Sequence, residues 1–348
     1  MSSPPSNGSS PASSPPPGPP YPPRTAGLGG VPTPSVDDPI SAVILIFFVA
    51  SAAFNMTILQ LNKRRGHKFI LSGLLFGFSM ARITANVMRI VWASYPHNAR
   101  IAIAAQIFIN AGVILLFAVN LIFTQRVVRA YHPHIGWSRI PTYFFRFLYF
   151  SIFACFVMLI TAVVYSFYTL NVSTLNRIHN VQLFAIVYLA ILAFLPTPIV
   201  AICLVLPRRG PIERFGTGRM RTKLFLLVFT SLLLSFSAGF RAGVSFVRRP
   251  LDDPAWFHHK AAFYCVNYLI EIICVYSYAL SRFDRRFHIP NGSSAPGHYV
   301  NGVPGSEKAP IPLKIPMRRE LQALLHSNPK LGEFQFQHGF KRQMFNEK

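Results

Sequence analysis

The stretch IAIAAQIFINAGVILLFAVNLIF, residues 101–123, decides the fold. It contains no charged side chain and is bounded by Arg100 on one side and Arg126 on the other. An α-helix needs about 20 mainly apolar residues to cross the hydrocarbon core of a bilayer. The stretch therefore predicts a membrane-spanning helix.

Six further runs of this kind surround it. Together the seven runs contain only four charged residues, Arg82, Arg89, Arg241 and Glu271, although the chain has 34 Lys and Arg and 11 Asp and Glu. The core of a soluble protein would give one or two such runs, not seven in succession. We therefore predict an all-α polytopic membrane protein, a bundle of seven transmembrane helices. The predicted spans are 40–61, 69–92, 101–123, 147–168, 181–206, 224–247 and 261–281.

The charge distribution predicts how the chain threads the bilayer. The formal net charge is +23, while 51% of the residues are hydrophobic. Seventeen Lys and Arg lie in the first, third and fifth loops and at the start of the C-terminal tail, against five in the opposite loops. Because cytoplasmic loops carry the excess of positive charge, the N-terminus is predicted outside and the C-terminus in the cytoplasm. This topology accounts for the basic loops, so we expect no nucleic-acid partner. We expect an integral membrane protein of the plasma membrane.

Three regions are predicted along the chain. Residues 1–38 are rich in Pro and Ser and form a disordered extracellular tail, since such a composition cannot bury enough apolar surface to fold. Residues 39–289 form the seven-helix membrane domain. Residues 290–348 form a mostly disordered cytoplasmic tail with a short helix near 317–326. The outside location makes Asn7 and Asn171 candidate glycosylation sites. The loops 124–146 and 207–223 are candidate contacts for a cytoplasmic protein.

Polar side chains inside the predicted spans form the candidate site. An ionisable residue at membrane depth is costly and therefore suggests function. From about 1.5 Å rise per residue, Arg82, Asn110, Asn267 and Glu271 fall in one layer, with Arg241 in the outer half. Glu271 is expected to pair with Arg82, and Arg241 is the alternative partner. The pair is either a structural clamp or part of a ligand, ion or switch site. The predicted layer consists of Arg82, Asn86, Asn110, Arg241, Asn267 and Glu271.

Other features of the spans predict packing. Arg89 lies near the outer end of its span and is expected to extend toward the headgroups. The glycine pairs at 73 and 77 and at 239 and 243 predict close helix packing within the monomer. Pro196 and Pro198 predict a kink in the fifth span.

Several activities are not supported by the sequence. All eleven His lie outside the spans or at their edges, so neither an intramembrane haem nor a zinc site is predicted. We find no phosphate-binding loop, and we expect no cofactor, no metal and no enzymatic activity. The expected function is receptor-like or lipid- and amphiphile-handling, with membrane lipid and a small amphiphilic ligand as partners. The alternative is a secondary transporter or proton-coupled exporter that uses Glu271.

Three segments carry a resemblance to known proteins. ARITANVMRIVW at 81–92, GFRAG at 239–243, and Glu271 followed by DRRFHIP at 284–290 resemble a filamentous-fungal family of seven-span membrane proteins of unknown function. The resemblance covers about 40–290. The chain is more distantly similar to the fungal Rta-like lipid-translocating exporter family, whose members place an Arg in span six and an acid in span seven. The first resemblance implies a fungal seven-span protein and names no reaction.

Overall fold

The computed structural model describes residues 18–22, 25–67, 69–208, 210–251 and 253–302. Within these residues, seven helical segments are long and apolar enough to cross a membrane. The same residues contain no strand, apart from an isolated bridge between Thr25 and Pro250. The prediction of an all-α seven-span membrane protein is confirmed. The predicted sequon at Asn7 and the predicted helix at 317–326 lie outside the described residues.

The spans agree with the predicted runs to within a few residues at some ends and extend up to nine residues further at others. They lengthen because the helices continue through polar residues that a hydropathy pattern does not count. Short helices α4, η1, α11 and α12 occupy Pro133–Gly136, Trp256–His258, Phe283–Arg286 and His298–Asn301. The spans are α1 (Pro34–Arg64), α2 (Leu71–Ser94), α3 (Ala99–Tyr131), α5 (Arg139–Ser166), α6 with α7 (Val172–Phe194 and Pro196–Val205), α8 (Met220–Phe246), and α9, η2 and α10 (Lys260–Phe263, Tyr264–Leu269 and Ile270–Leu280).

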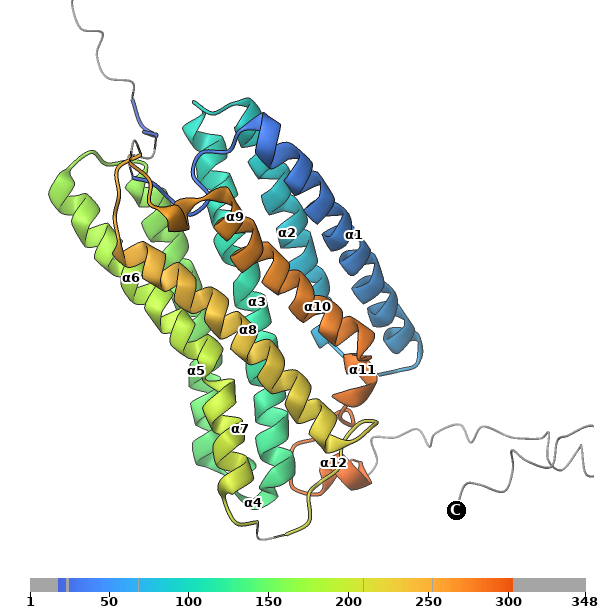
Figure 1. Ribbon diagram of the computed structural model, residues 1–348. Helices are drawn as coiled ribbons and strands as arrows, with labels where there is room; N and C mark the ends of the chain where they lie inside the picture. The colour runs from blue at the N-terminus through green and yellow to red at the C-terminus, as the bar shows by residue number, and fades with distance from the viewer. Residues whose placement is uncertain (1–17, 23–24, 68, 209, 252, 303–348) are drawn as a thin grey trace, which may run out of the picture. The chain divides into compact units, whose positions relative to one another are not determined.

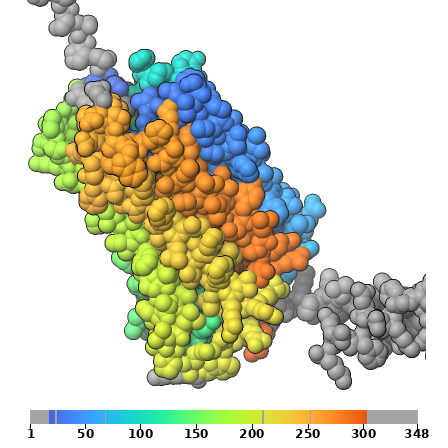
Figure 2. Space-filling view, viewed as in Figure 1, coloured from blue at the N-terminus to red at the C-terminus, as the bar shows by residue number. Residues whose placement is uncertain are grey.

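The seventh span lies between the first and sixth spans. Helices α1, α2 and α3 run antiparallel beside one another, and α10 packs against both α1 and α8 (Figure 1). Figure 2 shows this face of the bundle covered by side chains of α1, α8 and the seventh span. We call the end with the start of α1 the Asp37 end and the opposite end the Asp284 end. They lie at the top and bottom of Figure 1.

The outward-facing surface of the spans is apolar. On α5, Phe147, Phe150 and Phe153 expose 62%, 70% and 64% of their surface. Large contiguous apolar surfaces are rare on soluble monomers, and here they match the acyl chains of a bilayer. This supports the membrane assignment independently of helix length.

The described part of the predicted N-terminal tail is folded onto the bundle. The backbone N–H groups of Tyr21, Ala26 and Gly29 donate to the carbonyls of Phe167, Arg249 and His258. Helix α1 already begins at Pro34, so residues 34–38 belong to it. The boundary predicted at residue 38 is therefore too late, because Pro34 suits the first turn of a helix and Asp37 is held inside the protein.

Two spans depart from a regular α-helix. In the fifth, α6 is followed at Leu195 by α7 beginning at Pro196, and Leu195 itself keeps helical dihedrals, with φ −53° and ψ −35°. The seventh contains the π-helix η2, which no sequence signal indicated. A π-helix widens the turn and often accompanies functional sites.

The two predicted glycine pairs behave differently. A Cβ placed on Gly73 or Gly77 would make ordinary contacts with Leu59 or Leu115. Gly239 and Gly243 face open space, so the prediction of close packing at this second pair is wrong. Both are exposed because the buried face of α8 lies on other positions of the helix.

The fifth loop packs against the start of the C-terminal tail at the Asp284 end. The Thr217 N–H donates to the Arg285 carbonyl at 2.9 Å, and the Gly297 N–H donates to Glu213 Oε1 at 2.6 Å. Gly216 has φ +57°, and a Cβ there would lie 2.2 Å from the Arg286 carbonyl oxygen. The described part of the predicted tail, residues 290–302, includes α12 rather than lacking structure.

Candidate functional site

Arg82 and Glu271 form a buried ion pair between α2 and α10. Arg82 Nε donates to Glu271 Oε2 at 2.5 Å, and Arg82 Nη2 donates to Oε1. The side chains are 1% and 0% exposed. This is the partner expected from depth, and the alternative partner, Arg241, forms no ion pair with Glu271. A bidentate pair of this kind fixes both side chains in one geometry.

Helix α3 completes the environment of Arg82. Arg82 Nη1 donates to the Ile109 carbonyl at 2.7 Å. Its Cζ lies 5.4 Å from the ring centre of Tyr268 and 5.6 Å from that of Phe78. A Cβ on Gly112 would lie 2.9 Å from Arg82 Cζ. The absence of a side chain at Gly112 therefore makes room for the guanidinium, a requirement that the sequence pattern did not reveal.

Arg241 occupies a different environment, on α8. Arg241 Nη2 donates to Asn110 Oδ1 at 2.5 Å. None of the ion pairs formed by the described residues includes Arg241. A guanidinium carries five N–H donors, and only one is engaged by a described residue. Arg241 also keeps part of its surface accessible, unlike Arg82.

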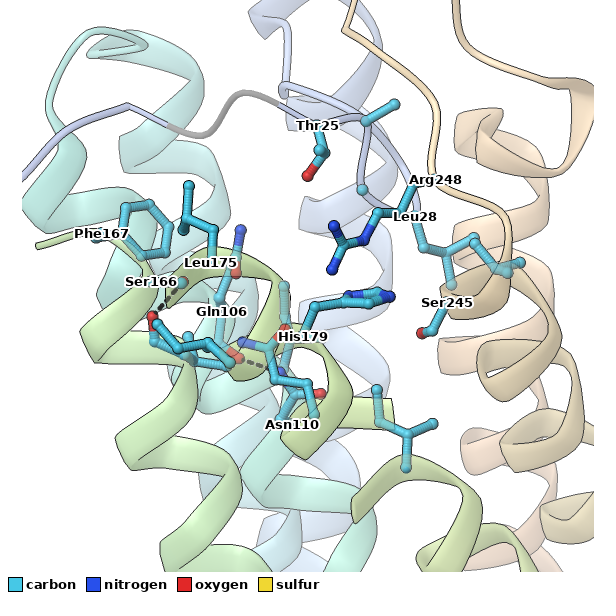
Figure 3. Close-up of a pocket in the computed structure, with 18 of the residues that line it drawn as sticks. Thr25, Leu28, Gln106, Asn110, Ser166, Phe167, Leu175, His179, Ser245 and Arg248 are labelled. Carbon is cyan, nitrogen blue, oxygen red and sulfur yellow. Dashed lines mark hydrogen bonds between the residues drawn. The ribbon is translucent and has the colours of Figure 1, made fainter. Parts of the chain in front are cut away.

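A cavity of about 450 Å³ lies beside Arg241 toward the Asp37 end. Its walls come from α2, α3, α5, α6, α8 and η2, and residues of the folded N-terminal segment cover it. In Figure 3, Arg248 from the residues after α8 and His179 from α6 extend toward the same space, which Thr25 and Gln106 also border. Apolar walls with a few polar groups are typical of sites for small organic ligands. The polar and charged lining side chains nearest the membrane interior are Gln106, Asn110, Gln182, Arg241 and Asn267.

The predicted layer is thus divided into two parts. Asn110, Arg241 and Asn267 line the cavity, whereas Arg82 and Glu271 do not. Asn86 is fully buried and donates to the Arg82 carbonyl at 2.8 Å, so it belongs to the closed part. Asn267 lies in the π-helix, is 2% exposed, and has no hydrogen-bond partner for Oδ1.

A second buried ion pair, between Arg89 and Asp37, was not predicted. Arg89 Nη2 donates to Asp37 Oδ1 at 2.7 Å and to the Gly29 carbonyl at 2.9 Å. The Tyr264 hydroxyl donates to the same Asp37 oxygen at 2.7 Å, and Lys260 Nζ lies 2.5 Å from Oδ2. Arg89 is 1% exposed, so the prediction that it extends to the headgroups is wrong. A carboxylate inside the protein holds it instead.

The lining of the cavity is cationic. Its described residues include Arg89, Arg241, Arg248 and His179, and none of them is Asp or Glu. Arg89 is neutralised by Asp37, and Arg248 donates to Asn176 Oδ1 at 2.8 Å near the exposed rim. Burial lowers the pKa of Arg248 from its ordinary value. Arg241 and Arg248 both lack a carboxylate partner among the described residues, and Arg241 is the less exposed of the two.

One further predicted residue, the glycosylation candidate Asn171, can be placed in the structure. Asn171 is exposed and caps α6, with its Oδ1 accepting from the N–H groups of Ser173 and Thr174. Among the described residues, no group of three or more His, Cys, Asp or Glu is arranged to hold a metal ion.

The fold and the intramembrane polar groups define a seven-span, all-α membrane protein. Residues 213–288 match the model of a family described as proteins of unknown function, DUF3112. The matched stretch contains Arg241, Asn267 and Glu271. No curated protein matches the chain. No solved structure matches it either.

Proposed function

We propose that this protein is a non-enzymatic membrane protein that binds a small amphiphilic molecule in the cavity at the Asp37 end. The observation that carries the proposal is a cavity of about 450 Å³ that combines apolar walls with Asn110, Arg241 and Asn267. Sites for small ligands have this composition and a volume in this range. With the predicted orientation, the cavity lies in the outer half of a plasma-membrane protein.

The closed pair Arg82–Glu271 has a structural role in this proposal. Both Glu271 oxygens accept hydrogen bonds from Arg82, and neither residue lines the cavity. The pair holds α2 against α10 and positions the wall from which Asn267 extends. Binding at the cavity would serve a receptor-like protein or a lipid-handling one. A receptor would also need a contact for a cytoplasmic protein, which we place at loops 124–146 and 207–223.

The second candidate is a proton-coupled exporter that uses Glu271. The π-helix in the seventh span favours it, because helices that depart from regular α geometry surround the substrate in many transporters. Glu271 could carry a proton only if Arg82 released it. Loss of pH-dependent substrate movement in Glu271→Gln proteoliposomes would support the exporter. A fungal origin and the distant similarity to lipid-translocating exporters stay predictions.

The cavity can be tested with Trp92 as a reporter, because it lines the cavity and the chain has three Trp. Replacing Trp137 and Trp256 by Phe leaves this single fluorophore. We expect ω-bromoundecanoic acid, its methyl ester, or both to quench Trp92 saturably in micelles of an uncharged detergent. If neither the acid nor the ester quenches Trp92 saturably, the proposal is refuted.

Two serines of α8 provide a matched pair of variants. Ser245 lines the cavity and Ser235 does not, yet both are partly buried and both donate to the carbonyl four residues earlier. Ser245→Phe should fill the cavity and weaken quenching at least tenfold. Ser235→Phe should leave it unchanged. Equal effects of the two variants would mean that the probe binds elsewhere.

A further inference from the structure

We infer that the ligand of this cavity has an anionic head group, a carboxylate or phosphate attached to an apolar chain, and that Arg241 binds the head. The inference rests on the proposed binding cavity and adds the chemical class of its ligand. It is carried by the charge of the lining, the free donors of Arg241 and the position of Asn267.

The charge of the lining selects an anion. Within the part of the chain that the structure describes, no Asp or Glu lines the cavity and Arg241 forms no ion pair. A cation at membrane depth is costly unless a partner compensates it. Glu271 is fully engaged by Arg82 and Asp37 by Arg89 and Lys260, so neither compensates Arg241. A bound carboxylate or phosphate would supply the missing charge.

The geometry of the donors suits such a head group. Asn110 Oδ1 holds one terminal nitrogen of Arg241 and so orients the guanidinium. The remaining N–H groups present the planar fork that binds carboxylates and phosphates through two hydrogen bonds. Asn267, 2% exposed and without a partner for its oxygen, is a second polar group at the same wall. Its amide can also turn its N–H₂ group toward an anion, since the two ends of the amide are similar in shape.

The rest of the cavity suits an apolar chain. Leu159, Val163 and Ile186 contribute side chains from α5 and α6, and Phe167 and Leu175 contribute from the loop and the start of α6. These apolar groups come from α5, α6 and the loop between them, whereas Arg241 comes from α8. A ligand with a charged head and an apolar chain therefore matches both walls, whereas a free inorganic anion would leave the apolar wall uncovered.

The test compares the two brominated probes in the single-Trp92 protein. We expect the acid to bind at least tenfold more tightly than its uncharged methyl ester at pH 8. Arg241→Gln should abolish this preference. Arg241→Lys keeps the positive charge and should retain part of the preference, so the comparison shows that the effect of Arg241→Gln comes from the lost charge and not from misfolding. Arg100→Gln, which removes an exposed charge outside the cavity at the same end, should change neither affinity.

The outcomes separate the inference from the proposed function. Equal affinities for acid and ester would overturn the anionic head and leave the binding cavity standing. Failure of both probes would refute the cavity itself. Undecyl phosphate should displace the acid. Displacement by butyrate or inorganic phosphate at equal concentration would overturn the need for an apolar chain.

Discussion

Arg82 and Glu271 bind each other through two hydrogen bonds in an environment closed to water, with 1% and 0% of their side chains exposed. Removing one member leaves the other as an uncompensated buried charge, which typically costs about 3–5 kcal/mol. We therefore expect Arg82→Gln and Glu271→Gln each to lower the free energy of unfolding by this amount. The measurement is reversible denaturation in micelles.

The double variant separates the pair from its surroundings. Arg82→Gln with Glu271→Gln should lose clearly less stability than the sum of the single losses, because no buried charge is left unpaired. The charge swap, Arg82→Glu with Glu271→Arg, should recover only part of the stability, since an Arg at 271 cannot reproduce the bond to the Ile109 carbonyl. Additive losses in the double variant would contradict the pairing.

Gly112 is expected to be intolerant of a side chain. A Cβ there would lie 2.9 Å from both Cζ and Nε of Arg82, and the guanidinium cannot retreat without breaking its bonds to Glu271. Gly112→Ala should therefore cost about 1–3 kcal/mol, as overpacking does. Gly77→Ala is the control, because its Cβ would meet Leu115 at 3.9 Å, and alanine favours a helix by about 1 kcal/mol. In thermal unfolding, Gly112→Ala should lower the melting temperature and Gly77→Ala should raise it.

The pair of Arg89 and Asp37 is expected to hold the N-terminal segment in place. Asp37→Asn leaves Arg89 buried without a carboxylate, so we expect a loss of about 3–5 kcal/mol and faster hydrogen exchange at Ala26 and Gly29. The control is Asp253→Asn, which removes an exposed pair with Arg249 that is worth about 0–1 kcal/mol. Unchanged exchange at residues 25–33 in Asp37→Asn would show that the pair does not retain the segment.

The spans and one ion pair could be predicted because they depend on two properties that can be read from the sequence. The length of an apolar run shows whether a helix can cross the membrane, and the position of a charged residue within the run gives its depth. Counting along the helices placed Arg82 and Glu271 at similar depth, and the structure pairs them. Asn110 and Asn267 were assigned to the same layer, and both line the cavity.

The remaining features depend on how chain segments meet. Asp37 precedes the first apolar run, so hydropathy assigned it to the tail, and Arg89 then lacked a visible partner. The π-helix changes which residues of the seventh span face inward, and no composition signal announces it. The cavity is a gap between α3, α5, α6 and α8 that forms only when their side chains pack. Such gaps depend on interhelical distances rather than on the polarity of single positions.

The His288 ring at the Asp284 end is expected to make stability depend on pH. Its centre lies 4.6 Å from that of His67, and Arg126 and Asp284 are further titratable neighbours among the described residues. Burial, followed by repulsion from His67 and Arg126, lowers the pKa of His288 below its usual 6.5, while Asp284 opposes this. As the pH falls through about 6.5, the unfolded chain binds a proton that the folded protein resists, so the free energy of unfolding should decrease.

The pH effect should reach its limit once the pH lies below the folded-state pKa, because both states then bind the proton. Burial also lowers the pKa of His258, which adds an effect of the same sign from the other end of the bundle. The difference between the wild-type protein and His288→Gln isolates the contribution of His288. We expect the variant to have a flatter stability profile between pH 8 and about 5.5. Parallel profiles would mean that His288 takes up its proton as easily in the folded protein as in the unfolded chain, against the burial and the cationic neighbours that the structure gives it.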